Sequence, residues 1–122
     1  MSRVVILEYF GSRDLAPAQV RDLVAEATGL TFEFRRSDYI GEYFMSGSPG
    51  GHAVVTVRPN EIEDEDGKFQ QWDEFADFTT IVEAKQVLTA EGEEPEFIGN
   101  LHQKLAEAVG LEFLRRSEPK PR

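Results

Sequence analysis

Residues 3–10 form an almost continuous apolar run, Arg3-Val4-Val5-Ile6-Leu7-Glu8-Tyr9-Phe10. β-branched residues dominate its first half, and a run of this length and composition is typical of a strand that is buried on both faces of a sheet. We therefore predict that residues 3–10 form a central strand, with the remaining elements arranged around it.

A helix is predicted directly after this strand. Residues 11–14 have the composition of a turn, in which Asp14 can cap a helix, and Pro17 is tolerated in a first helical turn. Apolar residues then recur at helical spacing up to Gly29, which suits the left-handed position after a helix end. We predict a helix over residues 15–28.

Further strands are predicted from alternating and β-branched stretches. Phe32 and Phe34 alternate with polar residues, which is typical of a half-buried strand. Glycines and a proline at 47–51 separate two β-prone runs and indicate a hairpin. The predicted strands after the first helix are residues 31–36, 39–46, 52–58 and 111–114, and residues 79–82 are a further β-prone run.

A second helix is predicted from the apolar stripe between Phe97 and Val109, with Gly110 at its end. Residues 26–37 resemble residues 107–117, since each stretch contains a helix end, a glycine, a short strand and paired arginines. The simpler explanation is that two strand–helix–strand units make the same turn in the same way. A duplication is the alternative, and it would not change the function.

These elements predict one α+β domain over residues 1–118, followed by a frayed tail at 119–122. We expect two layers with the order β-α-β-β-β-α-β, as in ferredoxin-like folds. The sheet is expected to be mostly antiparallel. Right-handed crossovers would place both helices on one face.

Composition excludes several classes of function. The 122 residues contain no Cys, which excludes disulfides and thiolate chemistry, and the net charge is −10. Such a charge disfavours binding to nucleic-acid phosphates and to anionic membranes. The amino-terminal apolar run is too short for a signal peptide, and no run approaches a membrane span, so we expect a cytoplasmic protein.

The negative charge is confined to one segment. Residues 1–59 carry 6 basic and 7 acidic side chains, and residues 98–122 carry 5 basic and 3 acidic ones. Residues 60–97, which we call the acidic segment, carry 2 basic and 13 acidic side chains, a net charge of −11. An excess in one place favours a local role over a general effect on solubility.

No motif of catalytic or cofactor-binding quality is present. Aligning the glycine of residues 61–67 with a calcium-binding loop leaves Ile62 at the first ligand position. His52 and His102 have no His or acidic neighbour at the spacing of a helical metal site, which favours solvated or structural roles. We predict no enzymatic activity, no cofactor and no metal.

The acidic segment also contains Phe69, Trp72, Phe75 and Phe78. Two interpretations stay open: the aromatics cover the core beneath a solvated loop, or they anchor an interface rimmed by charge. The residues that we predict to contact a partner are Glu63, Asp64, Glu65, Asp66, Trp72, Asp73, Glu74 and Asp77.

Four stretches, residues 38–44, 58–61, 63–67 and 74–78, resemble those of small acidic bacterial proteins that are similar in character to immunity proteins of polymorphic toxin systems. Those proteins bind and block a cognate toxin domain, frequently a basic one, without catalysis. The resemblance implies a non-enzymatic protein that blocks a basic toxin or nuclease. A small carboxylate-dependent enzyme and a self-associating structural protein are the alternatives.

Overall fold

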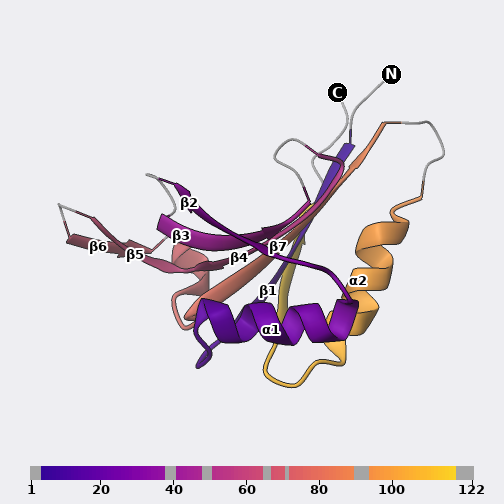
Figure 1. The fold of residues 1–122 in the computed structure, drawn as a ribbon. Coiled ribbons are helices and arrows are strands. Elements are labelled where there is room, and N and C mark those ends of the chain that lie inside the picture. The colour runs from indigo at the N-terminus through magenta and orange to yellow at the C-terminus, as the bar shows by residue number, and fades with distance from the viewer. Residues whose placement is uncertain are drawn as a thin grey trace.

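The computed structural model describes residues 4–37, 41–47, 51–64, 67–70, 72–89 and 94–117, with the backbone alone for 62–64, 68 and 69. One antiparallel sheet has the strand order β2-β3-β4-β7-β1-β8, and β5 pairs with β6 separately (Figure 1). The elements are β1 (Val4–Ser12), α1 (Pro17–Thr28), β2 (Glu33–Ser37), β3 (Gly41–Ser46), β4 (Ala53–Pro59), β5 (Glu61–Asp64), β6 (Gly67–Gln70), η1 (Asp73–Phe75), β7 (Thr80–Leu88), α2 (Glu96–Ala106) and β8 (Glu112–Ser117).

The strand β1 lies inside the sheet, as the apolar run predicts. It pairs with β7 on one side, from Val4 opposite Leu88 to Ser12 opposite Thr80, and with β8 on the other. Because β7 and β8 are both antiparallel to β1, they run parallel to each other, and α2 connects them across β1. The α1 connection is longer, since β7, β4 and β3 separate β1 from β2.

Both helices pack on one face of the sheet, which confirms the two-layer α+β prediction (Figure 1). Side chains that alternate along the central strands point toward the helices, as expected for a sheet with one covered face. The buried residues of this core are Ile6, Phe10, Val20, Val24, Val55, Val57, Val82, Ala84, Ile98, Leu101, Leu105 and Leu111. We call this side the helix face.

A smaller core lies on the opposite side, which we call the lid face. Tyr9, Phe75 and Ile81 are buried there, and Trp72 and Phe78 pack against them together with Leu7 and Leu114. Successive residues of β1 therefore contribute to both cores, so the prediction of a strand buried on both faces is confirmed. The cover on this side comes from η1 and the turn after it.

The order of elements contains more strands than predicted. The hairpin β5–β6 was not expected within the acidic segment, and β7 extends to Leu88 rather than ending at residue 82. Glu83 and Lys85 interrupt the apolar run of this strand, because these charged residues alternate with residues that face the helices. One of these is Gln86, whose Oε1 accepts a hydrogen bond of 3.0 Å from the backbone N of Ile98 in α2.

The helix boundaries also differ from the prediction. Asp14 does not cap α1; Ala16 is the N-cap, and its backbone N donates to Gln19 Oε1 at 2.9 Å. Gly29 ends α1 with φ of 76°, as expected. The second helix ends at Ala106 and not beside Gly110, and β8 accordingly runs over 112–117 rather than 111–114.

Some predictions fall outside the described residues, among them the tail at 119–122 and most of the hairpin tip at 48–50. Among the described residues, no helix is both long enough and apolar enough to cross a membrane.

Candidate functional site

Asn60 fixes residues 72–78, which we call the lid, against the sheet. Its side chain is 1% exposed. Its Nδ2 donates to the carbonyl oxygens of Phe75 at 2.8 Å and Phe78 at 3.2 Å, and its Oδ1 accepts from the backbone N of Trp72 at 3.0 Å. One buried amide therefore bonds to backbone groups at both ends of the lid, and at Phe75 O it adds to the bond that this oxygen accepts from Phe78 N.

The aromatic residues of the lid cover the sheet. The ring centroid of Tyr9 lies 5.7 Å from that of Trp72 and 5.9 Å from that of Phe75. These are normal separations for interacting aromatic rings. For Trp72, Phe75 and Phe78, the structure confirms the interpretation that aromatics of the acidic segment close the core.

Three arginines from outside the acidic segment contact the aromatic rings of the lid face. The guanidinium carbon of Arg58 lies 4.4 Å from the ring centroid of Trp72, and that of Arg13 lies 4.5 Å from Phe78. Arg115 reaches the rings of Phe75 and Tyr9. All of these distances are within the range of cation–π attraction.

The same arginines pair with carboxylates. Arg58 Nη2 lies 3.3 Å from Glu83 Oε2, and Arg115 Nη1 lies 2.5 Å from Glu74 Oε2. Arg13 Nη1 is 3.8 Å from Asp77 Oδ2. Part of the negative charge of the acidic segment is therefore balanced by cations of the nearly neutral remainder of the chain.

The structure brings four of the predicted contact residues together in the lid: Trp72, Asp73, Glu74 and Asp77. Trp72 is partly buried, whereas the three acidic residues are exposed. Of the other four, Glu63 and Asp64 lie on β5, where only the backbone is described, and Glu65 and Asp66 lie outside the described residues. Their contact with a partner stays a prediction.

The pKa of the Tyr9 phenol, on the lid face, is raised above its usual value. Burial is the largest cause, and the charge and hydrogen bond of Glu83 add to it, while Arg115 opposes them. The raised pKa means that Tyr9 keeps its proton more firmly beneath the lid than a tyrosine in water does.

A second polar contact, which the sequence analysis missed, lies on the helix face. Glu8 is 2% exposed, and its Oε1 is 2.6 Å from His102 Nδ1. The imidazole packs against both Phe10 and Phe113, at centroid distances of 5.5 and 4.8 Å, and those two rings also contact each other. The sequence signal for this contact was an acidic residue at a core position of an apolar strand, which requires a partner.

The pair of Glu8 and His102 has the arrangement of a carboxylate that orients a histidine base. The contact joins α2 to β1. Within the part of the chain that the structure describes, no group of three or more His, Cys, Asp or Glu could hold a metal ion.

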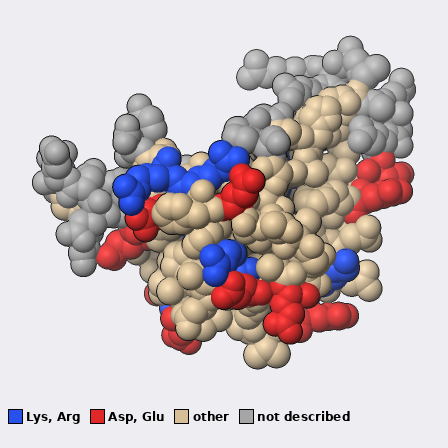
Figure 2. Space-filling view, viewed as in Figure 1, with Lys and Arg blue, Asp and Glu red and all other residues tan. Residues whose placement is uncertain are grey.

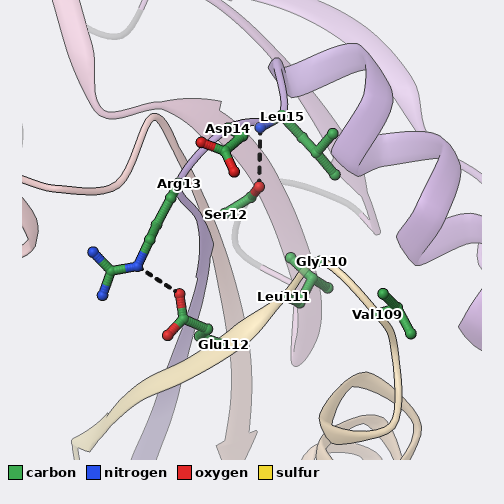
Figure 3. Close-up of a pocket in the computed structure, with 8 residues that line it drawn as sticks. All are labelled: Ser12, Arg13, Asp14, Leu15, Val109, Gly110, Leu111 and Glu112. Atoms are coloured by element: carbon green, nitrogen blue, oxygen red, sulfur yellow. Dashed lines mark hydrogen bonds and ion pairs between the residues drawn. The ribbon is translucent and has the colours of Figure 1, made fainter.

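Figure 2 shows the charge on the side that carries α1. Acidic side chains lie along one side of α1 and near the start of α2, while basic side chains lie over α1 itself and gather over β2 and β3. Figure 3 shows a pocket of about 420 Å³ between residues 12–15 and 109–112. Polar groups of its lining bond to one another: Ser12 Oγ accepts from Leu15 N, and Arg13 Nε donates to Glu112.

Comparisons with known proteins give no match: no family model, no curated protein and no solved structure matches this chain.

Proposed function

We propose that this chain is a non-enzymatic acidic binding protein that captures a basic protein domain, such as a toxin or nuclease, and blocks its site. The observation that carries the proposal is the confinement of a net charge of −11 to residues 60–97. Clustered carboxylates speed the encounter with a basic partner and favour it over neutral or acidic proteins.

The rigidity of the lid supports this proposal. Asn60 and the arginines hold residues 72–78 on the sheet, so their carboxylates need little ordering when a partner arrives. A surface that is already ordered binds with a smaller entropy cost. The resemblance to immunity proteins points to the same role.

The intramolecular ion pairs of the lid do not oppose this role. Arg115 and Glu74 are each about half exposed, and an exposed ion pair of this kind contributes little to stability. Lysine or arginine side chains of a partner can therefore replace Arg115 as the ion-pair partner of Glu74 at a small cost in free energy. Asp77, whose contact with Arg13 is longer, is available in the same way.

A charge-reversal experiment tests the proposal. The triple variant Asp64→Lys, Asp66→Lys and Asp73→Lys is compared with a control triple on other surfaces, Asp22→Lys, Glu26→Lys and Glu107→Lys. Each reversal adds two units of charge, so both triples change the net charge from −10 to −4. The probe is the purified product of an adjacent toxin-like reading frame, and lysozyme serves as an unrelated basic protein.

The wild type and the control triple should both bind the probe with an affinity that falls as salt rises. The acidic-segment triple should lose at least a hundredfold in affinity while its circular dichroism spectrum is unchanged. Equal loss in the two triples, or equal binding of lysozyme, would mean that only general charge attraction is present. Undiminished binding by the acidic-segment triple would refute the proposal.

A further inference from the structure

The two edges of the sheet carry nearly the same sequence. Residues 33–37 of β2 are Glu-Phe-Arg-Arg-Ser, and residues 112–117 of β8 are Glu-Phe-Leu-Arg-Arg-Ser. Each strand has one neighbour in the sheet, β3 for β2 and β1 for β8. The similarity between residues 26–37 and 107–117 thus gives the molecule two chemically related edges.

The two edges differ in their regularity. The pairing of β8 with β1 shifts register between Tyr9 and Phe10, so β8 contains a bulge. Bulges bend a strand and protect an edge against pairing with another molecule. In contrast, β2 pairs with β3 without a shift from Glu33 to Ser37, and it contains no proline. Its outer backbone groups can form a further ladder.

We propose that β2 of one copy pairs antiparallel with β2 of a second copy, which joins two sheets into one. An interface between identical edges has a twofold axis. In an antiparallel ladder, facing residues point their backbone groups the same way, either toward the partner strand or away from it. These directions alternate along a strand. The twofold axis must therefore lie level with one residue of β2, which then faces the same residue of the second copy, and not level with the midpoint between two residues.

One of the possible axes is chemically favourable. An axis at Arg35 or at Arg36 places that arginine opposite the same arginine of the second copy. An axis at Phe34 places the two Phe34 rings opposite each other and places Glu33 opposite Arg35 of the second copy, twice. Opposite charges and aromatic pairs stabilise facing positions, and like charges destabilise them.

The side chains of β2 are arranged for this register. Phe34 is 57% exposed, although its ring lies 5.8 Å from that of Phe44. Arg35 Nη2 donates to Glu33 Oε2 at 3.1 Å along the same edge, so the guanidinium already lies beside the carboxylate position that the second copy would occupy. A second copy would cover the phenylalanine and let Arg35 bond to Glu33 of the partner.

The interface is small. A five-residue strand buries far less than the 1,200–2,000 Å² of stable complexes. We therefore expect a reversible dimer with a dissociation constant of tens to hundreds of micromolar, on the order of other weak encounters. Self-association would not involve the acidic segment, so the triple variant described above should dimerise like the wild type.

Charge exchange tests the register. Glu33→Arg places arginines opposite arginines, and Arg35→Glu places glutamates opposite glutamates, so each variant alone should sediment as a monomer at concentrations where the wild type dimerises. The double variant should regain dimerisation. An equimolar mixture of the two single variants should form a heterodimer, because all facing charges are then opposite.

A cysteine pair tests the axis directly, since the chain has no Cys. Phe34→Cys should form a disulfide-linked dimer under mild oxidation, because the two residues face each other. Phe113→Cys on the bulged β8 is the matched control, at 46% exposure of the native residue, and should link at least tenfold more slowly. Equal rates, a wild type that stays monomeric at millimolar concentration, or a mixture that fails to associate would overturn the proposal.

Discussion

The two faces of the sheet are stabilised in different ways. On the helix face, apolar side chains of β1, β4 and β7 pack against stripes on two helices. On the lid face, a short segment without a regular helix is held by Asn60 and three arginines. The helix face rests on hydrophobic burial, which depends on area. The lid face rests on individual polar contacts, each of which can be removed by one substitution.

Asn60→Ala is the substitution that we expect to distinguish the two faces most strongly, because it should disturb the lid face alone. It removes the amide that bonds to Trp72 N and to the carbonyl oxygens of Phe75 and Phe78. Phe75 O keeps its bond from Phe78 N, and the other losses should cost about 3 kcal/mol in the free energy of unfolding. The fluorescence of Trp72, the only tryptophan, should shift to longer wavelength in the native state as the lid opens.

Leu105→Ala on the helix face is the control for this prediction. Leu105 is fully buried, and its truncation should cost a similar amount, about 2–5 kcal/mol. The native fluorescence of Trp72 should nevertheless stay the same, since the cavity lies on the other side of the sheet. Urea denaturation followed by fluorescence measures both quantities. An unchanged spectrum for Asn60→Ala would show that the lid does not depend on Asn60.

A smaller effect is expected for the one buried polar pair of the helix face described above. His102→Ala leaves the carboxyl of Glu8 buried without its partner and should cost about 2 kcal/mol. Adding Glu8→Leu to that variant should restore most of the loss, because the buried polar group is then gone. A double-mutant cycle in urea checks this, and additive losses would contradict a direct coupling of the two side chains.

The smallest effect is a pH dependence on the lid face. The pKa of Tyr9 is raised in the folded state, mainly by burial. The unfolded chain therefore loses this proton first, so stability is complete below about pH 10 and falls as the pH rises through the folded pKa. Tyr9→Phe should therefore have a flatter alkaline limb than the wild type when urea denaturation is repeated across this pH range, and an equally steep limb would contradict a raised pKa of Tyr9.

The same difference between the faces explains how much of the fold could be predicted from the sequence. Apolar periodicity, which a single sequence displays, predicts strand β1, the glycine end of α1 and the position of both helices on one face. Strand β7 was cut short because Glu83 and Lys85 interrupt that periodicity, although both face the lid side. Charged residues can occupy a strand there because Arg58 lies within reach of Glu83, and the sequence does not display that contact.

The candidate site was predicted only in part. Its location was expected, since charge and aromatics gather in one segment. The lid was not, because it depends on Asn60, which lies 12 residues before Trp72 and shows no local pattern. The contact of Glu8 with His102 spans 94 residues and was missed for the same reason.

The central position of β1 also has a consequence for the timing of folding. Its strand partners are β7 and β8, so the first strand of the domain pairs only with strands that begin at Thr80 or later. During synthesis, β1 leaves the ribosome early and must wait with its apolar side chains exposed until most of the domain has followed. Contacts this distant in sequence slow folding and prolong exposure to aggregation. Chaperone dependence should therefore be greatest while residues 13–79 are being translated.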